Sequence, residues 1–248
     1  MTTHNGALLS IILPAHNEEE RLSGTLEKID HFLQAQPYRA EVLVVENGSH
    51  DRTLELAHEA VNRFPYLRVI HEEQRGKGLA VRSGMLQASG QYRFICDVDL
   101  SMPIEEVNRF LPPHLQDAPI AIASREAPGA RRYNEPEYRH IVGRAFNLLV
   151  RLFALPGLHD SQCGFKCFRA DVAGDVFPCQ TINGWTFDVE VLFIARRRGY
   201  RIVEIPIPWY FNPQSKVRVL RDSFVMASDL VKIRLNALRG RYDNCKKP

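Results

Sequence analysis

Two aspartates separated by one residue, Asp97 and Asp99, follow directly after an apolar stretch of the sequence. The stretch Tyr92 to Cys96 is typical of a buried β-strand, so both carboxylates are expected where a strand ends. Paired carboxylate oxygens at such a place suit a hard divalent cation, Mg²⁺ or Mn²⁺, that also holds a substrate diphosphate. The spacing therefore predicts a metal site at Asp97 and Asp99.

A second candidate segment, Arg75-Gly76-Lys77-Gly78, places two cations and two glycines just before an expected helix. Backbone amides and basic side chains at a helix start suit a phosphate-bearing ligand. The sequence contains no Gly-x-x-x-x-Gly-Lys-Ser/Thr motif, and no dinucleotide fingerprint follows Gly76. We therefore expect neither a P-loop enzyme nor an NAD enzyme.

The elements that must position these residues alternate between strands and helices. Expected strands span 8–13, 41–45, 67–71, 92–96 and 120–124, and expected helices span 51–64, 78–88 and 103–110, with a further helix capped by Asn17. Such alternation predicts an α/β, Rossmann-like doubly wound, mostly parallel sheet flanked by helices. Its ligands should bind at the carboxyl ends of the strands, where residues 14–18, 46–49 and 97–99 would meet. The polar segment from 125 to about 137 is expected to be a functional loop.

The chain divides into a catalytic domain, residues 1–215, and a basic amphipathic C-terminal helix and tail, residues 216–248. Residues 196–248 carry 13 Lys and Arg against four Asp and Glu, a net charge of +9 that leaves −6 for the rest of a chain with net charge +3. An apolar stripe along 220–238, flanked by cations, predicts a helix that lies on an anionic membrane surface. Packing of that stripe on the catalytic domain is the alternative.

Localisation is predicted from the apolar runs and the cysteines. No apolar run reaches the roughly 18 to 20 residues that cross a bilayer. Five scattered cysteines indicate reduced thiols, hence a cytoplasmic protein at the inner face of a membrane. His159, Cys163 and Cys167 recur every four residues, which would suit a metal on a helix, but a fourth ligand is missing.

Several short motifs occur in an order that resembles the family-2 glycosyltransferases with the GT-A fold. They are Pro14-Ala15-His16-Asn17-Glu18, Val45-Glu46-Asn47-Gly48-Ser49, Arg75-Gly76-Lys77-Gly78, Asp97-Val98-Asp99-Leu100-Ser101 and Ser124-Arg125. Later motifs resemble the polyprenyl-phosphate branch, especially dolichyl-phosphate glucosyltransferases: Asp160-Ser161-Gln162-Cys163-Gly164-Phe165-Lys166, Trp185-x-Phe187-Asp188-Val189-Glu190 and Ser215-Lys216-Val217. The resemblance spans about residues 8 to 234.

This resemblance implies a nucleotide-sugar donor, with UDP-glucose favoured, and a polyprenyl-phosphate acceptor. The implied donor-binding residues are Pro14, His16, Asn17, Glu18, Glu46, Asn47, Arg75 and Lys77, and the implied metal ligands are Asp97 and Asp99. The acceptor phosphate would be held by Arg125, Arg131, Arg132 and Lys216. Asp97, Asp99, Arg125 and Asp188 are thus the expected catalytic residues, and no nucleic-acid partner is expected.

The expected reaction is an in-line displacement that inverts the sugar's anomeric carbon. A phosphate acceptor is already anionic near neutral pH and needs no strong base. A hydroxyl acceptor would need one, and Asp188 or Glu190 would be the first candidates. Three alternatives remain open: a soluble or hydroxyl acceptor, a GDP-mannose donor, and a noncatalytic nucleotide-sugar binding module.

Overall fold

A computed structural model gives the fold and describes residues 6–116, 118–213, 219–243 and 245, with backbone only for 219–223. The element order begins β1 (Leu9–Ala15), α1 (Leu22–Gln34), β2 (Ala40–Asn47), α2 (Thr53–Val61), β3 (Leu67–Glu72), α3 (Lys77–Gln87) and β4 (Tyr92–Ile95). It continues with the 3₁₀ helix η1 (Ile104–Phe110), β5 (Ile120–Ser124), β6 (Arg131–Tyr133), α4 (Glu137–Phe153), β7 (Lys166–Arg169) and α5 (Ala170–Val176). The remaining elements are η2 (Phe177–Cys179), α6 (Phe187–Arg197), β8 (Ile202–Pro206), β9 (Pro208–Tyr210) and α7 (Val219–Leu238).

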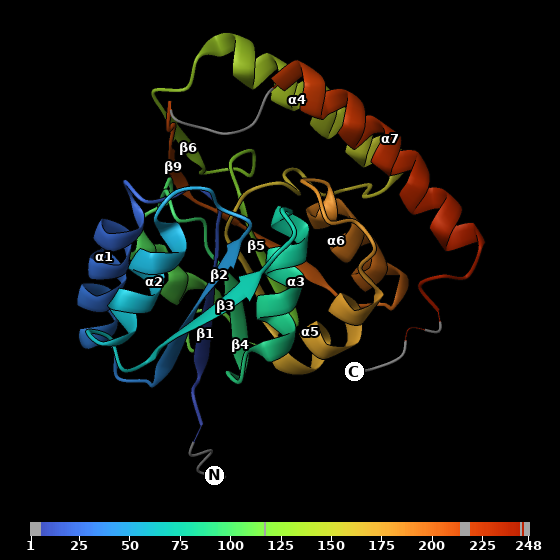
Figure 1. The fold of residues 1–248 in the computed structure, drawn as a ribbon. Helices are drawn as coiled ribbons and strands as arrows, with labels where there is room; N and C mark the ends of the chain where they lie inside the picture. Colours follow the sequence, from blue (N-terminus) through green and yellow to red (C-terminus); the bar gives the residue numbers. More distant parts are fainter. Residues whose placement is uncertain (1–5, 117, 214–218, 244, 246–248) are drawn as a thin grey trace.

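Seven strands form the main sheet in the order β3-β2-β1-β4-β7-β5-β8. All neighbours pair in parallel except β7, which runs antiparallel to both β4 and β5. Helices cover both faces, with α1 and α2 on one side and α3, α5 and α6 on the other (Figure 1). The predicted α/β, mostly parallel architecture is therefore confirmed.

Strand alternation divides the core into two layers. Along β1, Leu9, Ile11 and Leu13 face the cluster that contains α1 and α2, whereas Ile12 faces the cluster that contains α3, α5 and α6. These four side chains have no exposed surface. A central strand that is apolar on both faces reads as an unbroken hydrophobic run, as residues 8–13 do.

The first helix begins later than its expected cap. Asn17 has a left-handed backbone (φ +52°) and lies in a turn, where its N–H donates to Ser49 Oγ and its Oδ1 accepts from the N–H of His50. Helix α1 starts at Leu22. The expectation that Asn17 caps this helix is therefore wrong, because its amide instead ties the end of β1 to the loop after β2.

Helices α4 and α7 lie side by side along one edge of the molecule (Figure 1). Met226, Leu230 and Ile233 of α7 belong to the same core cluster as Phe146 and Val150 of α4. Part of the apolar stripe along 220–238 therefore packs on the catalytic domain, which was the alternative to membrane binding. The domain boundary predicted at 215/216 and the cation Lys216 lie outside the described residues. No helix in the described ranges is long and apolar enough to cross a membrane.

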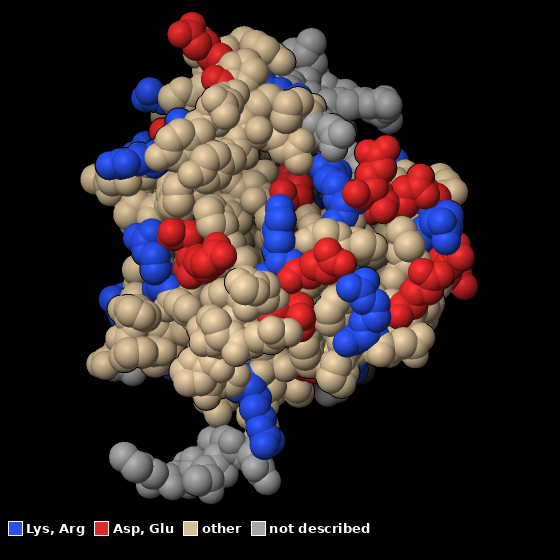
Figure 2. All heavy atoms as spheres, turned by 90° about the vertical axis from the view of Figure 1, so that its left-hand side faces the viewer, with Lys and Arg blue, Asp and Glu red and all other residues tan. Residues whose placement is uncertain are grey.

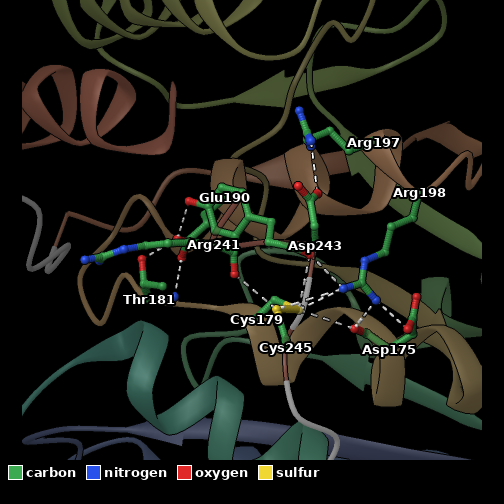
Figure 3. Close-up of a disulfide and its surroundings, with 10 residues drawn as sticks. Asp175, Cys179, Thr181, Glu190, Arg197, Arg198, Arg241, Asp243 and Cys245 are labelled. Atoms are coloured by element: carbon green, nitrogen blue, oxygen red, sulfur yellow. Dashed lines mark hydrogen bonds and ion pairs between the residues drawn. A yellow bond between two sulfur atoms is a disulfide. The ribbon is translucent and has the colours of Figure 1, made fainter. Parts of the chain in front are cut away.

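A disulfide joins Cys179 to Cys245, across 66 residues of sequence (Figure 3). The prediction of five reduced thiols is wrong for this pair, because the chain after α7 returns to η2 and brings the two cysteines together. Cys96, Cys163 and Cys167 are free and buried. The argument from thiols to a cytoplasmic location therefore loses its basis. Cys167 lies on β7 rather than on a helix, and the His159 ring contacts Glu204.

Candidate active site

The two aspartates lie just beyond β4, at the carboxyl end of the parallel strands. Asp97 Oδ1 is 2.6 Å from the ammonium of Lys77, the first residue of α3. Asp99 Oδ1 accepts a bond from the N–H of Ser101 at 3.0 Å. Burial and the neighbouring charge of Asp97 raise the pKa of Asp99. This repulsion between close carboxylates is the electrostatic setting that a bound cation relieves.

Gly164 fixes the position of Asp97 from the other side. A Cβ atom built on Gly164 would lie 2.1 Å from Asp97 Oδ2, well inside contact distance. The loop before β7 therefore packs directly on the carboxylate, and any residue larger than glycine would displace it. The motif around residues 160–166 thus contacts the metal-site candidate, although the two are separated by more than 60 residues in sequence.

A second ion pair lies behind the first. The Asp188 Oδ1 atom, on the first turn of α6, is 2.8 Å from the ammonium of Lys166, whose side chain is 1% exposed. Lys166 also donates to the carbonyl of Cys163. Burial raises the pKa of Asp188, while the charges of Lys166 and Lys77 act in the opposite direction. The pair places a buried carboxylate beside Lys77 and so near the metal-site candidate.

The predicted nucleoside-binding residues line the ends of β1 and β2. Pro14 lies on β1, and His16 Nδ1 is 2.8 Å from the carbonyl of Asn47, at the end of β2. Glu46 is buried, with one oxygen accepting from the N–H of Ser49 and the other 2.6 Å from His71 Nδ1. Glu46 therefore shapes the loop that follows β2.

The turn after β1 contacts the start of α2 as well. The N–H of Glu18 donates to Thr53 Oγ1 at 2.7 Å, and the Glu18 carboxylate pairs with Arg21. Together with the contact between Asn17 and Ser49, this bond brings the segments 14–18 and 46–49 to one edge of the sheet, as their positions at strand ends predict.

The two glycines around Lys77 have a packing role that the sequence did not predict. A Cβ on Gly76 would meet the carbonyl oxygen of Asn183 at 2.7 Å, and one on Gly78 would meet that of Ile182 at 2.6 Å. The Gly78 N–H donates to the Asn183 carbonyl at 2.8 Å. The glycines therefore let the start of α3 approach residues 182–183 closely, which orients Lys77 toward Asp97.

Arg125 makes a two-point ion pair with Asp160. Its Nε and Nη2 donate to the two carboxylate oxygens at 2.7 and 3.0 Å, and its backbone N–H donates to Oδ2 at 3.0 Å. Burial alone would raise the pKa of Asp160, but the charge and the bonds of Arg125 lower it to about 2. The pair joins the end of β5 to the loop that carries Gly164.

Arg131 and Arg132, two further residues of the predicted acceptor site, lie on β6, beside β9. Arg132 pairs with Glu126 and Glu135, and the guanidinium groups of Arg125 and Arg132 lie 5.4 and 5.9 Å from the Trp209 ring centroid. Arg131 is exposed. The structure therefore brings Arg125, Arg131 and Arg132 into one region.

On the surface seen from the side of α1, acidic and basic side chains are interspersed between wider areas of uncharged residues (Figure 2). This face therefore has no large patch of a single charge sign.

Comparison with known proteins identifies the family. Residues 10–177 match the sequence model for glycosyl transferase family 2. The chain belongs to glycosyl transferase family 2. It is 33% identical to a dolichyl-phosphate beta-glucosyltransferase of Saccharomyces cerevisiae, covering 96% of this chain and 78% of that protein. A protein with the same name from Dictyostelium discoideum is 31% identical, over 94% of this chain and 75% of its own length.

Solved structures confirm the GT-A fold of this family 2 member. Glucosyl-3-phosphoglycerate synthase from Mycobacterium tuberculosis, in complex with UDP, superposes with a TM-score of 0.66 at 18% identity, over 96% of this chain and 81% of its own. Mannosyl-3-phosphoglycerate synthase from Rubrobacter xylanophilus gives a TM-score of 0.67 at 16% identity, over 98% and 78% of the two chains.

Sequence reasoning gave no separate role to three of the residues that organise this site. Lys166, Asp160 and Gly164 all belong to the segment 160–166, which was recognised only as a motif. The available signal was Lys166, whose neighbours in the sequence are phenylalanines and cysteines, residue types that are usually buried. A buried lysine requires an anionic partner.

Proposed function

We propose that this family 2 member transfers glucose from UDP-glucose to a polyprenyl phosphate, with inversion at the anomeric carbon and with Mg²⁺ or Mn²⁺ as cofactor. The arrangement of Asp97, Asp99 and Lys77 at the end of β4 is the observation that carries this proposal. The near full-length similarity to dolichyl-phosphate beta-glucosyltransferases supports the choice of sugar and acceptor class.

The donor atoms fit a hard divalent metal. Asp97 and Asp99 supply only carboxylate oxygens, and Mg²⁺ or Mn²⁺ prefers such ligands while leaving other positions for water and phosphate. Burial, together with the neighbouring charge of Asp97, raises the pKa of Asp99. Among the solved relatives, glucosyl-3-phosphoglycerate synthase has been crystallised with Mn²⁺ and UDP-glucose. When bound, the metal would stabilise the charge that develops on the leaving diphosphate.

The side chains of the site have separate roles in binding the donor and in catalysis. Pro14, His16, Asn17, Glu18, Glu46 and Asn47 form or support the nucleoside end of the site. Lys77 and Arg75 supply positive charge for the diphosphate, and Lys166 holds Asp188 in place beside them. A phosphate acceptor attacks without a base; with a hydroxyl acceptor, Asp188 would accept the proton. Glu190 is a poor candidate for that step, because Thr181, Ile182 and Tyr242 all donate to its two oxygens.

We assign the acceptor phosphate to Arg125, Arg131 and Arg132, with Lys216 as a further cation. Arg131 is exposed and free to turn toward an anion. The Nε and Nη2 atoms of Arg125 each donate one hydrogen to Asp160, which leaves the two hydrogens of Nη1 and the second hydrogen of Nη2 for a substrate. Two of these arginines also contact Trp209, so their planes are fixed before the acceptor arrives.

The acceptor lipid would be reached through a membrane-binding face formed by α4 and α7. Most large apolar side chains that the described part of the chain exposes lie on these two adjacent helices. On α4 they are Tyr138, Ile141, Leu148, Leu149, Leu152 and Phe153, and on α7 they are Phe224, Val225, Val231, Leu235 and Leu238. An exposed apolar area of this kind marks a binding surface. With Lys232 and Arg239 nearby, it suits peripheral binding to an anionic membrane.

A donor and acceptor screen tests the proposal. Release of the nucleoside diphosphate is measured for UDP-glucose, UDP-galactose and GDP-mannose, with Mn²⁺ or EDTA, and with polyprenyl phosphate, 3-phosphoglycerate or a hydroxyl acceptor. We expect turnover only with UDP-glucose, Mn²⁺ and polyprenyl phosphate together. Turnover with 3-phosphoglycerate or a hydroxyl acceptor but no lipid would replace the proposed acceptor. Binding without turnover in every combination would indicate a noncatalytic module.

A further inference from the structure

Lys77 and Gly164 lie against the two carboxylate oxygens of Asp97, whose side chain is 27% exposed. Oδ1 lies 2.6 Å from Lys77 Nζ, and Oδ2 lies beside Gly164, where a Cβ would be only 2.1 Å away. Mg²⁺ approaches a carboxylate oxygen to about 2.0–2.1 Å. A cation that binds Oδ1 therefore competes with the ammonium of Lys77, and this flexible side chain is the group that can move.

The surroundings of Lys77 hold its ammonium firmly on Asp97. Its side chain is only 19% exposed, and Nζ lies 5.2 Å from the Trp185 ring centroid. Asp97 is the carboxylate that the ammonium contacts, and Asp99 and Asp188 add negative charge in the same region.

We propose that Lys77 is an internal counter-cation that blocks metal binding at Asp97 until a nucleoside diphosphate offers the ammonium a second anionic partner. This inference rests on the proposed donor class. The Lys77 ammonium already contacts Asp97, so a diphosphate held by a metal at Asp97 and Asp99 lies within reach of this flexible side chain. Lys77 then exchanges Asp97 for the diphosphate, and Asp97 Oδ1 is released to the metal. Metal and donor thus bind as one unit.

A lysine that only binds phosphate would behave differently. It would contribute to nucleotide affinity, but its loss would leave the affinity for metal alone unchanged or changed only by the general loss of one positive charge. The two roles therefore separate in a metal titration without nucleotide, where no diphosphate is present to be bound.

The test measures Mn²⁺ affinity by electron paramagnetic resonance of free Mn²⁺, without nucleotide, for wild type, Lys77→Met, Lys77→Gln and Lys77→Arg. We expect Mn²⁺ to bind the Met and Gln variants at least about tenfold more tightly than wild type, because a unit charge in contact with the ligand is removed. Lys77→Arg should stay near wild type. Arg75→Gln is the matched control: it removes a neighbouring exposed cation for which the described residues provide no carboxylate partner, and we expect a change below about twofold.

Equal Mn²⁺ affinity in wild type and in both neutral Lys77 variants would overturn the inference, as would equal tightening by Arg75→Gln. Two neutral variants of Lys77 are used, so that one remains informative if the other fails to fold. Circular dichroism identifies a variant with a folding defect. The outcome is independent of the proposed reaction. A protein without turnover on any nucleotide sugar can still show the tightening, and an active glucosyltransferase can lack it.

Discussion

Gly164 lies so close to Asp97 that a single methyl group on its Cα would stand 2.1 Å from the carboxylate oxygen Oδ2. The first prediction follows from this contact. Gly164→Ala should lower kcat/KM at least about a hundredfold and weaken metal-dependent donor binding, because Asp97 must turn away. Gly174→Ala on α5, where an added Cβ meets nothing within 4 Å, is the control and should retain activity. If Gly164→Ala keeps near wild-type kinetics, the position of Asp97 does not matter for the reaction.

The aspartate pair itself gives the second prediction. Asp99→Ala and Asp97→Ala should each abolish transfer and Mn²⁺-dependent donor binding, while the temperature of unfolding changes little, because the carboxylates lie beyond a strand end and not in the core. Activity assays and calorimetry with UDP-glucose check both statements. If either variant turns over near the wild-type rate with the same metal requirement, these residues do not bind the metal.

A third prediction concerns the pH profile. Burial raises the pKa of Asp188, and the charge of Lys166 lowers it. Removal of that charge in Lys166→Met should raise the pKa of Asp188 further, so Asp188 is protonated at a higher pH. If the charged form of Asp188 is required, the acidic limb of kcat/KM moves to higher pH in this variant. Lys166→Arg should restore most of the wild-type profile. A uniform loss of rate without a shift would indicate that Lys166 acts only in packing.

The pair of Arg125 and Asp160 predicts a change in stability. Asp160→Asn should lower the free energy of unfolding at pH 7 by about 3 kcal/mol, the low end of the range for breaking a buried ion pair, since it leaves a partly buried guanidinium without its counter-charge. The exposed pair of Glu27 and Arg63 supplies the control, and Glu27→Gln should cost less than about 1 kcal/mol. Urea unfolding measures both values. Similar costs for the two variants would show that the Arg125 pair contributes no more than a surface contact.

The same pair has a defined pH dependence. The pKa of Asp160 is about 2 in the folded protein and about 3.9 in an unfolded chain. Its stabilisation is therefore complete above about pH 4 and is lost as the pH falls toward 2. The difference in unfolding free energy between wild type and Asp160→Asn should shrink by roughly 1 kcal/mol between pH 5 and pH 3. A difference that stays constant over this range would contradict the lowered pKa.

Membrane binding gives the last prediction. Leu148→Glu with Leu152→Glu on α4 should weaken binding to anionic vesicles at least about tenfold, because two exposed leucines lose roughly 2 kcal/mol each of apolar contact. Val61→Glu, on an exposed apolar residue of α2, is the matched control and should bind normally. Vesicle co-sedimentation at low and high salt measures this, and activity on acceptor in detergent should persist. Normal binding by the α4 variant would exclude this helix from the membrane-binding face.

Much of the sheet was predictable because the buried strands β1, β2, β4 and β5 each read as an apolar run followed by polar residues, whereas β7 (Lys166–Arg169) does not and was not predicted. The strands at 8–13, 41–45 and 92–96 and the meeting of their polar ends depend only on local patterns and on the parallel topology. The late start of α1 was not predictable from Asn17. Asn17 is a residue type that often caps helices, but here it bonds to Ser49 and His50 in the loop after β2. No local sequence pattern distinguishes a helix cap from such a contact.

The candidate site was predictable in its residue types but not in its pairings. The motif around Asp97 and Asp99 indicated a metal, whereas the neighbouring residues Lys77, Gly164 and Lys166 come from two distant segments, one at the start of α3 and one that runs into β7. The two glycines beside Lys77 suggested a phosphate loop, which stays a prediction, and the structure adds that they let the backbone of α3 pack on residues 182–183. Such tertiary contacts leave no periodic signal in the sequence, so only their residue types could be noted.

The return of the chain after α7 limits how that helix can be studied. Tyr242 is 2% exposed and donates its hydroxyl hydrogen to Glu190, and Cys245 is bonded to Cys179 (Figure 3). A chain shortened before α7 would therefore lose a core tyrosine, a cross-link and a partner of a buried carboxylate at the same time. Truncation would report on the integrity of the catalytic domain and not on membrane affinity. Substitutions on the outer faces of α4 and α7 are the changes that separate membrane affinity from the integrity of the catalytic domain.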